Sequence, residues 1–298
     1  MHGVSRRVLL AGGIGATAVA VLGGAGYELV QDGTLPGKYQ LDRLLGACGS
    51  DPGIPDVAIG TVSATTFYSG YRRRTVRMIA MRPPRVRGPL PVAIVLHGMG
   101  DDAQSAVSLG YPQYLAAAVG SGVRPFAAVS VDGGGSVYWH RRDDGDDPLG
   151  MIIDEALPRL RRAGYRIAKI AVIGWSMGGY GALLLASSLG PDQVAAVAAS
   201  SPAVFPSYAA ADSANGGAFD SPADFAANDI ASGSRLATLR RIPVRIDCGS
   251  SDPFGPQDTL LRGELGNPAG AISGGCHDQA FWRRSLPAEL AFLGRHLS

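Results

Sequence analysis

The chain has 298 residues, enough for one large domain or two small ones. Apolar residues make up 46% of it and charged residues 17%, which excludes global disorder and provides for a substantial core. Lysine and arginine total 27 against 25 acidic residues, so the chain lacks the excess of basic residues that is typical of nucleic-acid-binding proteins. Three cysteines cannot form a disulfide scaffold or a four-ligand zinc site.

Residues 1–30 have the pattern of an export signal. The adjacent Arg6 and Arg7 are followed by no charged residue before Glu28. A serine precedes the arginine pair and two leucines follow Val8, which resembles a twin-arginine signal. We therefore expect export to the cell envelope or the medium. Residues 8–27 would act as a membrane anchor if the signal is not cleaved, and cleavage is left open.

After residue 30, a linker and then an alternating pattern are expected. Residues 31–55 are rich in glycine, proline and aspartate, which predicts a linker before a domain at 56–298. Strands are expected at Val57–Phe67, Thr75–Met81, Val92–His97, Phe126–Asp132, Ile170–Gly174, Val194–Ser200, Val244–Cys248 and Ala271–Ser273. Helices are expected around Tyr114–Val119, Leu149–Arg162, Met177–Ser188 and Gln279–His296.

This alternation predicts an α/β fold. The first two strands read as an antiparallel pair that turns at Ser69 and Gly70. The later strands are almost continuously apolar, which is typical of a mostly parallel sheet covered by helices on both faces. Residues 203–240 begin as a polar, glycine- and alanine-rich loop, and Ser221 followed by Pro222 predicts a helix start. An insertion of this kind indicates a lid or a substrate wall.

The strongest chemical signal is the pentapeptide from Gly174 to Gly178, which has the form G-x-S-x-G around Ser176. It follows an apolar strand and precedes an apolar helix, the context in which the motif places a nucleophilic serine at a sharp turn. Bare flanking positions are needed because a side chain at either glycine would collide there. Backbone N–H groups at the helix start would favour developing negative charge.

A serine nucleophile needs a base, and in this arrangement the base follows the acid in the chain. After Ser176 only His277 and His296 remain. His296 ends an amphipathic helix near the C-terminus, whereas His277 lies in a loop just after the last expected strand. His277 is therefore the candidate base.

The acid that orients the base is expected on the preceding strand end. Asp252 follows the strand Val244–Cys248, on the side where open α/β sheets build their sites. Asp247 lies inside that strand and Asp258 in the next expected helix, so both are weaker alternatives. Asp252 also fits as a helix cap, a role that is compatible with catalysis.

The oxyanion hole requires two backbone donors. Met177, directly after the nucleophile, should give one, and the loop after the strand Val92–His97 should give the other. Glycine permits close backbone approach, so the Gly98–Met99 peptide is the candidate. His97 precedes the serine in the chain and is interpreted as a framework residue of this loop.

Tyr138 and Trp139, at the end of a central strand, and Trp175 within the serine motif are candidate substrate-binding residues. Packing of the Tyr138–Trp139 pair beneath the lid is an equal alternative. The acidic run Asp143–Asp147 ends at Pro148 and reads as a solvated loop and helix start. No metal and no cofactor are therefore expected.

The cysteines allow a disulfide in an exported protein. Cys248 ends the strand before the acid, and Cys276 immediately precedes the base, so a bridge between them would join the two loops. Buried free thiols are equally compatible with the sequence. Cys48, in the expected linker, is another possible partner for either residue.

Residues 57–298 resemble the "putative esterase" branch of the α/β-hydrolases, which includes S-formylglutathione hydrolase and the secreted mycolyltransferases. The resemblance is carried by the His97-Gly98 loop, the run from Gly174 to Gly181, Asp252 and the His277 loop. It implies carboxylic ester hydrolysis or acyl transfer through an acyl-serine intermediate, with a small acyl ester or lipid as substrate. The lid region, residues 203–240, matches no member of this branch closely enough for a particular substrate to be inferred from the resemblance. The alternatives are a serine esterase, an acyltransferase, and a catalytically silent surface protein.

Overall fold

A mixed sheet forms the centre of the computed structural model, which describes residues 37–297. Its strands stand in the order β1-β2-β4-β3-β5-β6-β7-β8, and all neighbours from β4 through β3 to β8 are parallel. The strands are β1 (Val62–Ser69), β2 (Arg74–Met81), β3 (Pro91–Leu96), β4 (Ala127–Val131), β5 (Arg166–Trp175), β6 (Val194–Ser200), β7 (Val244–Gly249) and β8 (Ile272–Ser273). The predicted mostly parallel sheet is confirmed, although β1 begins at Val62 rather than Val57.

The antiparallel edge of the sheet is also confirmed. In the β1–β2 hairpin Ser69 pairs with Arg74, so the turn occupies residues 70–73. Arg72 in this turn points inward and forms a buried ion pair with Asp146. The acidic run that contains Asp146 was predicted to be solvated, and for this residue the prediction is wrong because the guanidinium stabilises its carboxylate inside the protein.

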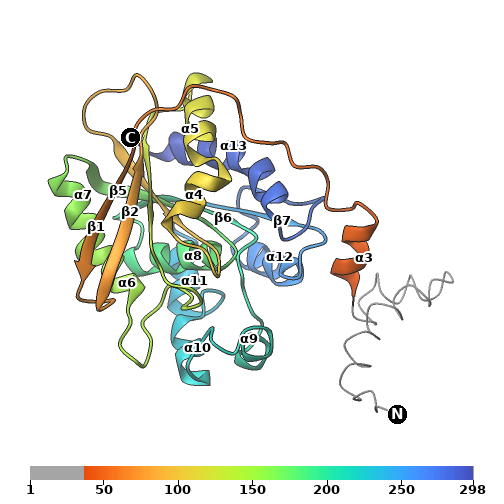
Figure 1. The fold of residues 1–298 in the computed structure, drawn as a ribbon. Helices are drawn as coiled ribbons and strands as arrows, with labels where there is room; N and C mark the ends of the chain where they lie inside the picture. Colours follow the sequence, from red (N-terminus) through yellow and green to blue (C-terminus); the bar gives the residue numbers. More distant parts are fainter. Residues whose placement is uncertain (1–36, 298) are drawn as a thin grey trace, which may run out of the picture.

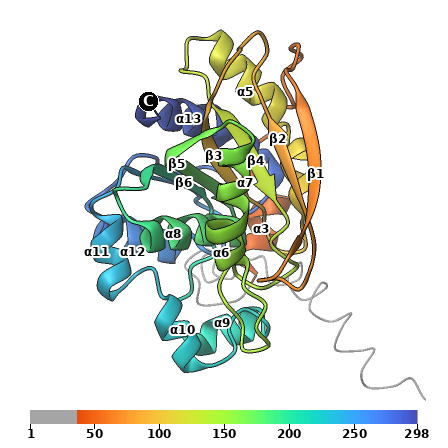
Figure 2. The same cartoon turned by 90° about the vertical axis from the view of Figure 1, so that its left-hand side faces the viewer.

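Helices cover both faces of the sheet, which gives three layers (Figure 2). One face is packed by α4 (Ala103–Leu109), α5 (Tyr111–Gly120) and α13 (Gln279–His296). The other is packed mainly by α8 (Met177–Leu189), α12 (Gly255–Glu264) and a helical run consisting of α6 (Pro148–Gly150), the π-helix η1 (Met151–Ala156) and α7 (Leu157–Arg162). Residues of β3 alternate between the two layers, as the two-residue period of a strand requires: Ile94 faces one core and Val95 the other.

The predicted helix Leu149–Arg162 is therefore real but not uniform. Pro158 lies in its last part and has no N–H to donate to the preceding turn, and the turn before it widens into η1.

The lid region contains three short helices: α9 (Tyr208–Ala214), α10 (Pro222–Asn228) and α11 (Gly233–Leu239). The Ser221 hydroxyl accepts the Asp224 N–H at the start of α10, so the predicted helix start is confirmed. Figure 1 shows α9 and α10 together at one end of the molecule. Arg142 fastens this region to the loop after β4 through two bonds to the Asp220 carboxylate, at 3.0 and 2.6 Å.

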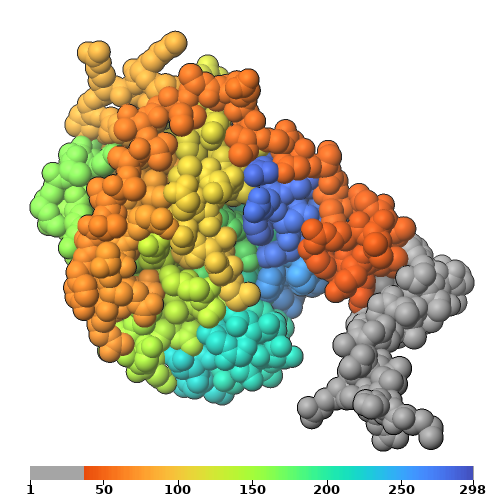
Figure 3. All heavy atoms as spheres, in the orientation of Figure 1, coloured from red at the N-terminus to blue at the C-terminus, as the bar shows by residue number. Residues whose placement is uncertain are grey.

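Residues 37–54, within the segment predicted as a linker, form what we call the N-terminal arm. The arm starts with helix α3 (Lys38–Leu44) and then runs along α13 and α5 at the surface (Figures 1 and 3). The predicted signal at 1–30 lies outside the described residues. Between residues 37 and 297, no helix has the length and apolar character that crossing a bilayer requires.

Candidate active site

Ser176 sits in the turn between β5 and α8 with φ 56° and ψ −125°, a strained conformation for a residue with a side chain. The flanking glycines explain how the turn fits. A Cβ added to Gly174 would lie 2.2 Å from the Gly178 carbonyl oxygen, and one added to Gly178 would lie 2.0 Å from the Leu96 carbonyl oxygen. The expectation that both positions must be bare is confirmed, and the tight contact brings the serine turn against the end of β3.

His277 connects Ser176 with Asp252. Its Nε2 lies 2.8 Å from the Ser176 Oγ, and its Nδ1 lies 2.8 Å from the Asp252 Oδ2. The Asp252 side chain is fully buried, whereas that of His277 is 19% exposed. The other Asp252 oxygen accepts the Phe254 N–H at 2.9 Å, just ahead of α12. The N-cap of α12 is Phe254 and no side chain caps this helix, so the alternative role of Asp252 as a helix cap is wrong. The structure thus brings together the three residues that the sequence proposed.

The alternative residues have other environments. Asp247 forms an ion pair with Arg245 at 2.6 Å, and burial raises the pKa of its carboxyl. Burial also raises the pKa of Asp258 well above its usual range, which favours the neutral acid. His296 ends α13 and packs against Phe292. None of these three contacts His277 through a hydrogen bond in the described residues.

The loop after β3 is rigidly held. The His97 side chain is buried, and its Nε2 accepts the Gly133 N–H at 2.9 Å. Its Nδ1 lies 2.8 Å from the Gly98 carbonyl oxygen, so Nδ1 carries the proton. Burial lowers the pKa of this imidazole, which keeps it neutral. His97 therefore stabilises the loop and lies away from Ser176 and His277 in the hydrogen-bond network, which matches its predicted framework role.

The predicted oxyanion donors belong to the serine turn and to the loop after β3. Met177 is the first residue of α8, so its N–H has no intrahelical acceptor. The neighbouring Gly100 N–H donates to the Gly135 carbonyl at 2.7 Å, which ties the Gly98–Met99 loop to the loop after β4. Met99 itself is 53% exposed.

The predicted substrate-binding aromatics are buried instead of lining an open surface. Trp139 has no exposed surface, and a Cβ on Gly133 would approach its ring to 2.1 Å. Its indole N–H donates to the His97 carbonyl, so Trp139 stabilises the loop after β3. Tyr138 is 3% exposed, and burial raises its pKa to about 12. Trp175 is 2% exposed and donates to Asp101 at 3.2 Å. The alternative of packing beneath the lid describes Tyr138, whose ring contacts Phe205 and Phe219, whereas Trp139 packs against Gly133 and Gly181.

The rings that contact His277 were missed by the sequence analysis. Phe254 and Trp282 lie 5.2 and 5.4 Å from the imidazole between ring centroids. Both follow predicted site residues closely in sequence, and this proximity was the available signal. They shield the imidazole and leave the side facing Ser176 for reaction.

Two hollows of the surface lie elsewhere. One of about 490 Å³ lies between α8, α10 and α11, and one of about 220 Å³ has His97 and Asp132 in its lining; Ser176 lines neither. The ligand atoms of Cys48, Cys276 and Asp278 lie within 4.8 Å of one another in the described part of the chain. The two sulfurs are bonded to each other, so they are not available to coordinate a metal ion.

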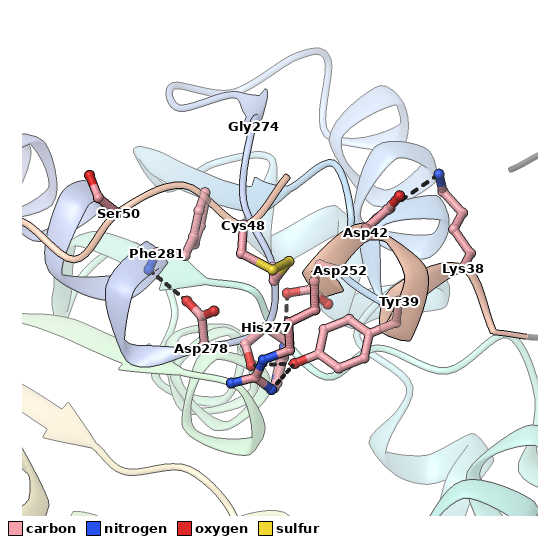
Figure 4. The surroundings of a disulfide bond; sticks show 12 residues. Lys38, Tyr39, Asp42, Cys48, Ser50, Asp252, Gly274, His277, Asp278 and Phe281 are labelled. Atoms are coloured by element: carbon pink, nitrogen blue, oxygen red, sulfur yellow. Dashed lines mark hydrogen bonds and ion pairs between the residues drawn. A yellow bond between two sulfur atoms is a disulfide. The ribbon is translucent and has the colours of Figure 1, made fainter. Parts of the chain in front are cut away.

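The disulfide joins Cys48 of the N-terminal arm to Cys276 (Figure 4). The predicted Cys248–Cys276 bridge is wrong, since Cys248 is a buried free thiol. The alternative partner, Cys48, is the one used. Burial raises the pKa of the Cys248 thiol, so it stays protonated and unreactive.

A parallel-rich sheet with a serine turn after its fifth strand and an acid and a histidine after its last two strands is an α/β-hydrolase fold. A sequence profile of the family described as "Putative esterase" matches residues 69–293. The chain belongs to that family, and this membership supports carboxylic ester hydrolysis.

Solved structures agree with this fold. A ferulic acid esterase is 24% identical with a TM-score of 0.67, covering 80% of this chain and 98% of its own. An S-formylglutathione hydrolase from Agrobacterium tumefaciens is 15% identical with a TM-score of 0.66, covering 84% and 100%. Mycobacterium tuberculosis MPT51 (FbpC1) is 18% identical with a TM-score of 0.61, covering 80% and 100%. Among curated protein sequences, none matches this chain.

Proposed function

We propose that this protein is a serine esterase that hydrolyses carboxylic acyl esters through an acyl-serine intermediate. The observation that carries the proposal is the position of His277, with one ring nitrogen 2.8 Å from the Ser176 hydroxyl and the other 2.8 Å from Asp252. This is the geometry of a nucleophile, a general base and the group that orients the base.

In the acylation half, His277 Nε2 takes the Ser176 proton as Oγ attacks the ester carbonyl carbon. The carbonyl oxygen becomes an oxyanion, for which the N–H groups of Met177 and Met99 are the proposed donors. Asp252 stabilises the imidazolium through Nδ1. The C–O bond to the alcohol then breaks, and His277 returns the proton to the leaving alkoxide, which departs as the alcohol.

In the deacylation half, water replaces the alcohol. His277 takes a proton from the water while its oxygen attacks the acyl carbon, and a second oxyanion forms in the same position. Collapse breaks the bond to the Ser176 Oγ, which recovers its proton from His277. The products are a carboxylic acid and the free enzyme.

The experiment is Ser176→Ala, assayed with p-nitrophenyl acetate and a fluorophosphonate probe. Alanine fits the same turn, so the fold should persist while kcat falls about 10³- to 10⁶-fold. The probe should label the wild type and not the variant. A folded variant that keeps a tenth of wild-type turnover would show that the nucleophile is a different residue.

The two alternatives have separate outcomes in the same assays. A catalytically silent protein would not react with the fluorophosphonate. An acyltransferase would release mostly a new ester, rather than the acid, when an alcohol or sugar acceptor is added. The ratio of hydrolysis to transfer products therefore distinguishes esterase from transferase.

We also propose that the protein is exported by the twin-arginine route. Arg6 and Arg7 ahead of a glycine-rich apolar stretch support it, and so does a disulfide, which persists mainly in oxidising compartments. Lysine keeps the charge but not the guanidinium. The double variant Arg6→Lys, Arg7→Lys should therefore accumulate in the cell rather than in the envelope or the medium, which immunoblotting of the separated fractions would show. Normal export of that variant would contradict this route.

A further inference from the structure

The loop that carries His277 is short and has little regular structure of its own. It connects β8, which has two residues, to α13 and comprises residues 274–278. On one side it is held by the acid loop, whose Ser251 N–H donates to the Gly275 carbonyl at 2.9 Å. On its other side it meets the N-terminal arm, which comes from the opposite end of the chain.

The arm reaches this loop at two points directly beside the base. The Cys48–Cys276 disulfide is attached to the residue before His277. The Tyr39 hydroxyl donates to the His277 backbone carbonyl at 3.4 Å. Figure 4 shows Tyr39 and Cys48 of the arm, together with Asp252, close to His277.

Arg284 of α13 connects the arm to the same loop. One guanidinium nitrogen donates to the Cys48 carbonyl at 2.8 Å and the Gly274 carbonyl at 3.3 Å, and the other donates to the Ser50 carbonyl at 2.8 Å. Through these hydrogen bonds, one side chain of α13 links the arm to the loop of residues 274–278, called the base loop below.

The arm starts with a short helix that buries little apolar surface. Helix α3 has seven residues, too few to be stable alone. Its Leu44 and Leu45 are 79% and 59% exposed, so they contribute little core packing. The disulfide and the hydrogen bonds to the base loop therefore contribute to its position, and the arm restrains the loop in return.

We infer that the N-terminal arm positions the base: the Cys48–Cys276 bridge and the Tyr39 hydroxyl hold the His277 loop so that the imidazole can form hydrogen bonds to both Asp252 and Ser176. This inference rests on the proposed esterase function. Cys48 and Tyr39 are positioning residues, since they act through the loop and touch no reacting atom.

The first test is reversible reduction of the wild type with a dithiol. The dithiol gives two electrons and two protons to the bridge, leaves two thiols, and is itself oxidised to a cyclic disulfide. We expect kcat to fall at least about ten-fold with little change in KM, because a misplacement of about 1 Å costs about 10²-fold in rate. Reoxidation should restore kcat, and the variant Cys48→Ser should show the low kcat in either condition.

The kinetics of fluorophosphonate labelling separate positioning from simple loss of stability. The final extent of labelling counts the molecules whose serine can react, whereas the rate constant reports how well His277 activates that serine in each molecule. Reduction should therefore lower the rate constant of labelling and leave its final extent unchanged. A stability effect alone would lower the final extent and leave the rate constant of the remaining folded molecules unchanged.

Tyr39→Phe tests the same role without breaking the bridge, and it decides the matter if the reduced protein loses its fold at 25 °C. We expect a two- to three-fold lower kcat, of the order of one lost hydrogen bond, with the rate constant of labelling lowered to a similar degree. Asp51→Asn is the matched control, because it removes the arm's ion pair with Arg283 and touches nothing in the base loop. Its kcat and labelling rate should equal those of the wild type.

The inference is overturned if the reduced, folded enzyme keeps its kcat and labelling rate, or if Tyr39→Phe is labelled at the rate of the wild type. Fluorophosphonate labelling of the oxidised wild type reports separately on the proposed function. Labelled enzyme that is insensitive to reduction contradicts the positioning role alone, whereas unlabelled oxidised enzyme contradicts the esterase proposal.

Discussion

Gly178→Ala tests the contact between the serine turn and the end of β3. The new methyl carbon would lie 2.0 Å from the Leu96 carbonyl oxygen and 2.6 Å from the His97 carbonyl oxygen, both of which are backbone atoms. Restoring an ordinary contact requires the turn and the strand to separate by roughly 1.4 Å, and such overpacking costs about 1–3 kcal/mol. Because this movement separates Ser176 from the loop after β3, we also expect kcat to fall about 10²-fold.

The assay pairs urea unfolding with turnover of p-nitrophenyl acetate. Gly263→Ala is the matched control, because a Cβ there meets nothing within 4 Å on helix α12. That substitution should stabilise the protein by about 0.5–1 kcal/mol and leave kcat unchanged. If Gly178→Ala kept wild-type stability and a kcat within a factor of three, the steric account of the turn would be refuted.

Three further predictions follow from the described contacts. Burial raises the pKa of Glu289 to about 8 from an ordinary 4.5, so the folded state binds this proton more tightly and the free energy of unfolding should decrease as pH rises through this range. Urea unfolding at pH 5.5 and 8.5 should show a smaller decrease in the free energy of unfolding for Glu289→Gln than for the wild type. An equal decrease in the two proteins would contradict the assignment. Arg142→Ala removes the bonds to Asp220 and should accelerate amide hydrogen exchange in residues 207–228, whereas Arg141→Ala, at an exposed position, should not. Ser176→Gly relieves a positive φ and should stabilise the fold by about 1 kcal/mol despite inactivity; a lower Tm than that of Ser176→Ala would count against backbone strain.

The parts of the fold that follow from local patterns could be predicted. The apolar strands and the turn around Ser176 are defined by neighbouring residues, because the period of burial and the need for bare glycines are local properties. The chain order then limited the base to two histidines, and the strand ends brought Asp252 and His277 to the same edge of the sheet.

What could not be predicted depends on contacts between distant segments. For Trp139 the sequence left substrate contact and packing as equal alternatives, and only the folded arrangement reveals that its ring fills the space beside Gly133 and Gly181. The composition of residues 31–55 indicated a linker, whereas Cys48 fixes part of it beside the base. Three cysteines allow three pairings, and no local pattern distinguishes between them.

The bridge between Cys48 and Cys276 has a sequence separation of 228, so it closes a covalent ring that contains every strand of the sheet. A single peptide-bond cleavage within the ring, for example in the exposed loop near Gly217, opens the ring without dividing the molecule into two. The fragment with Ser176 would remain joined to the fragment with Asp252. A nicked molecule would run as one band on a denaturing gel without reductant and as two bands with it. This topology preserves the association of the active-site segments after a first cut.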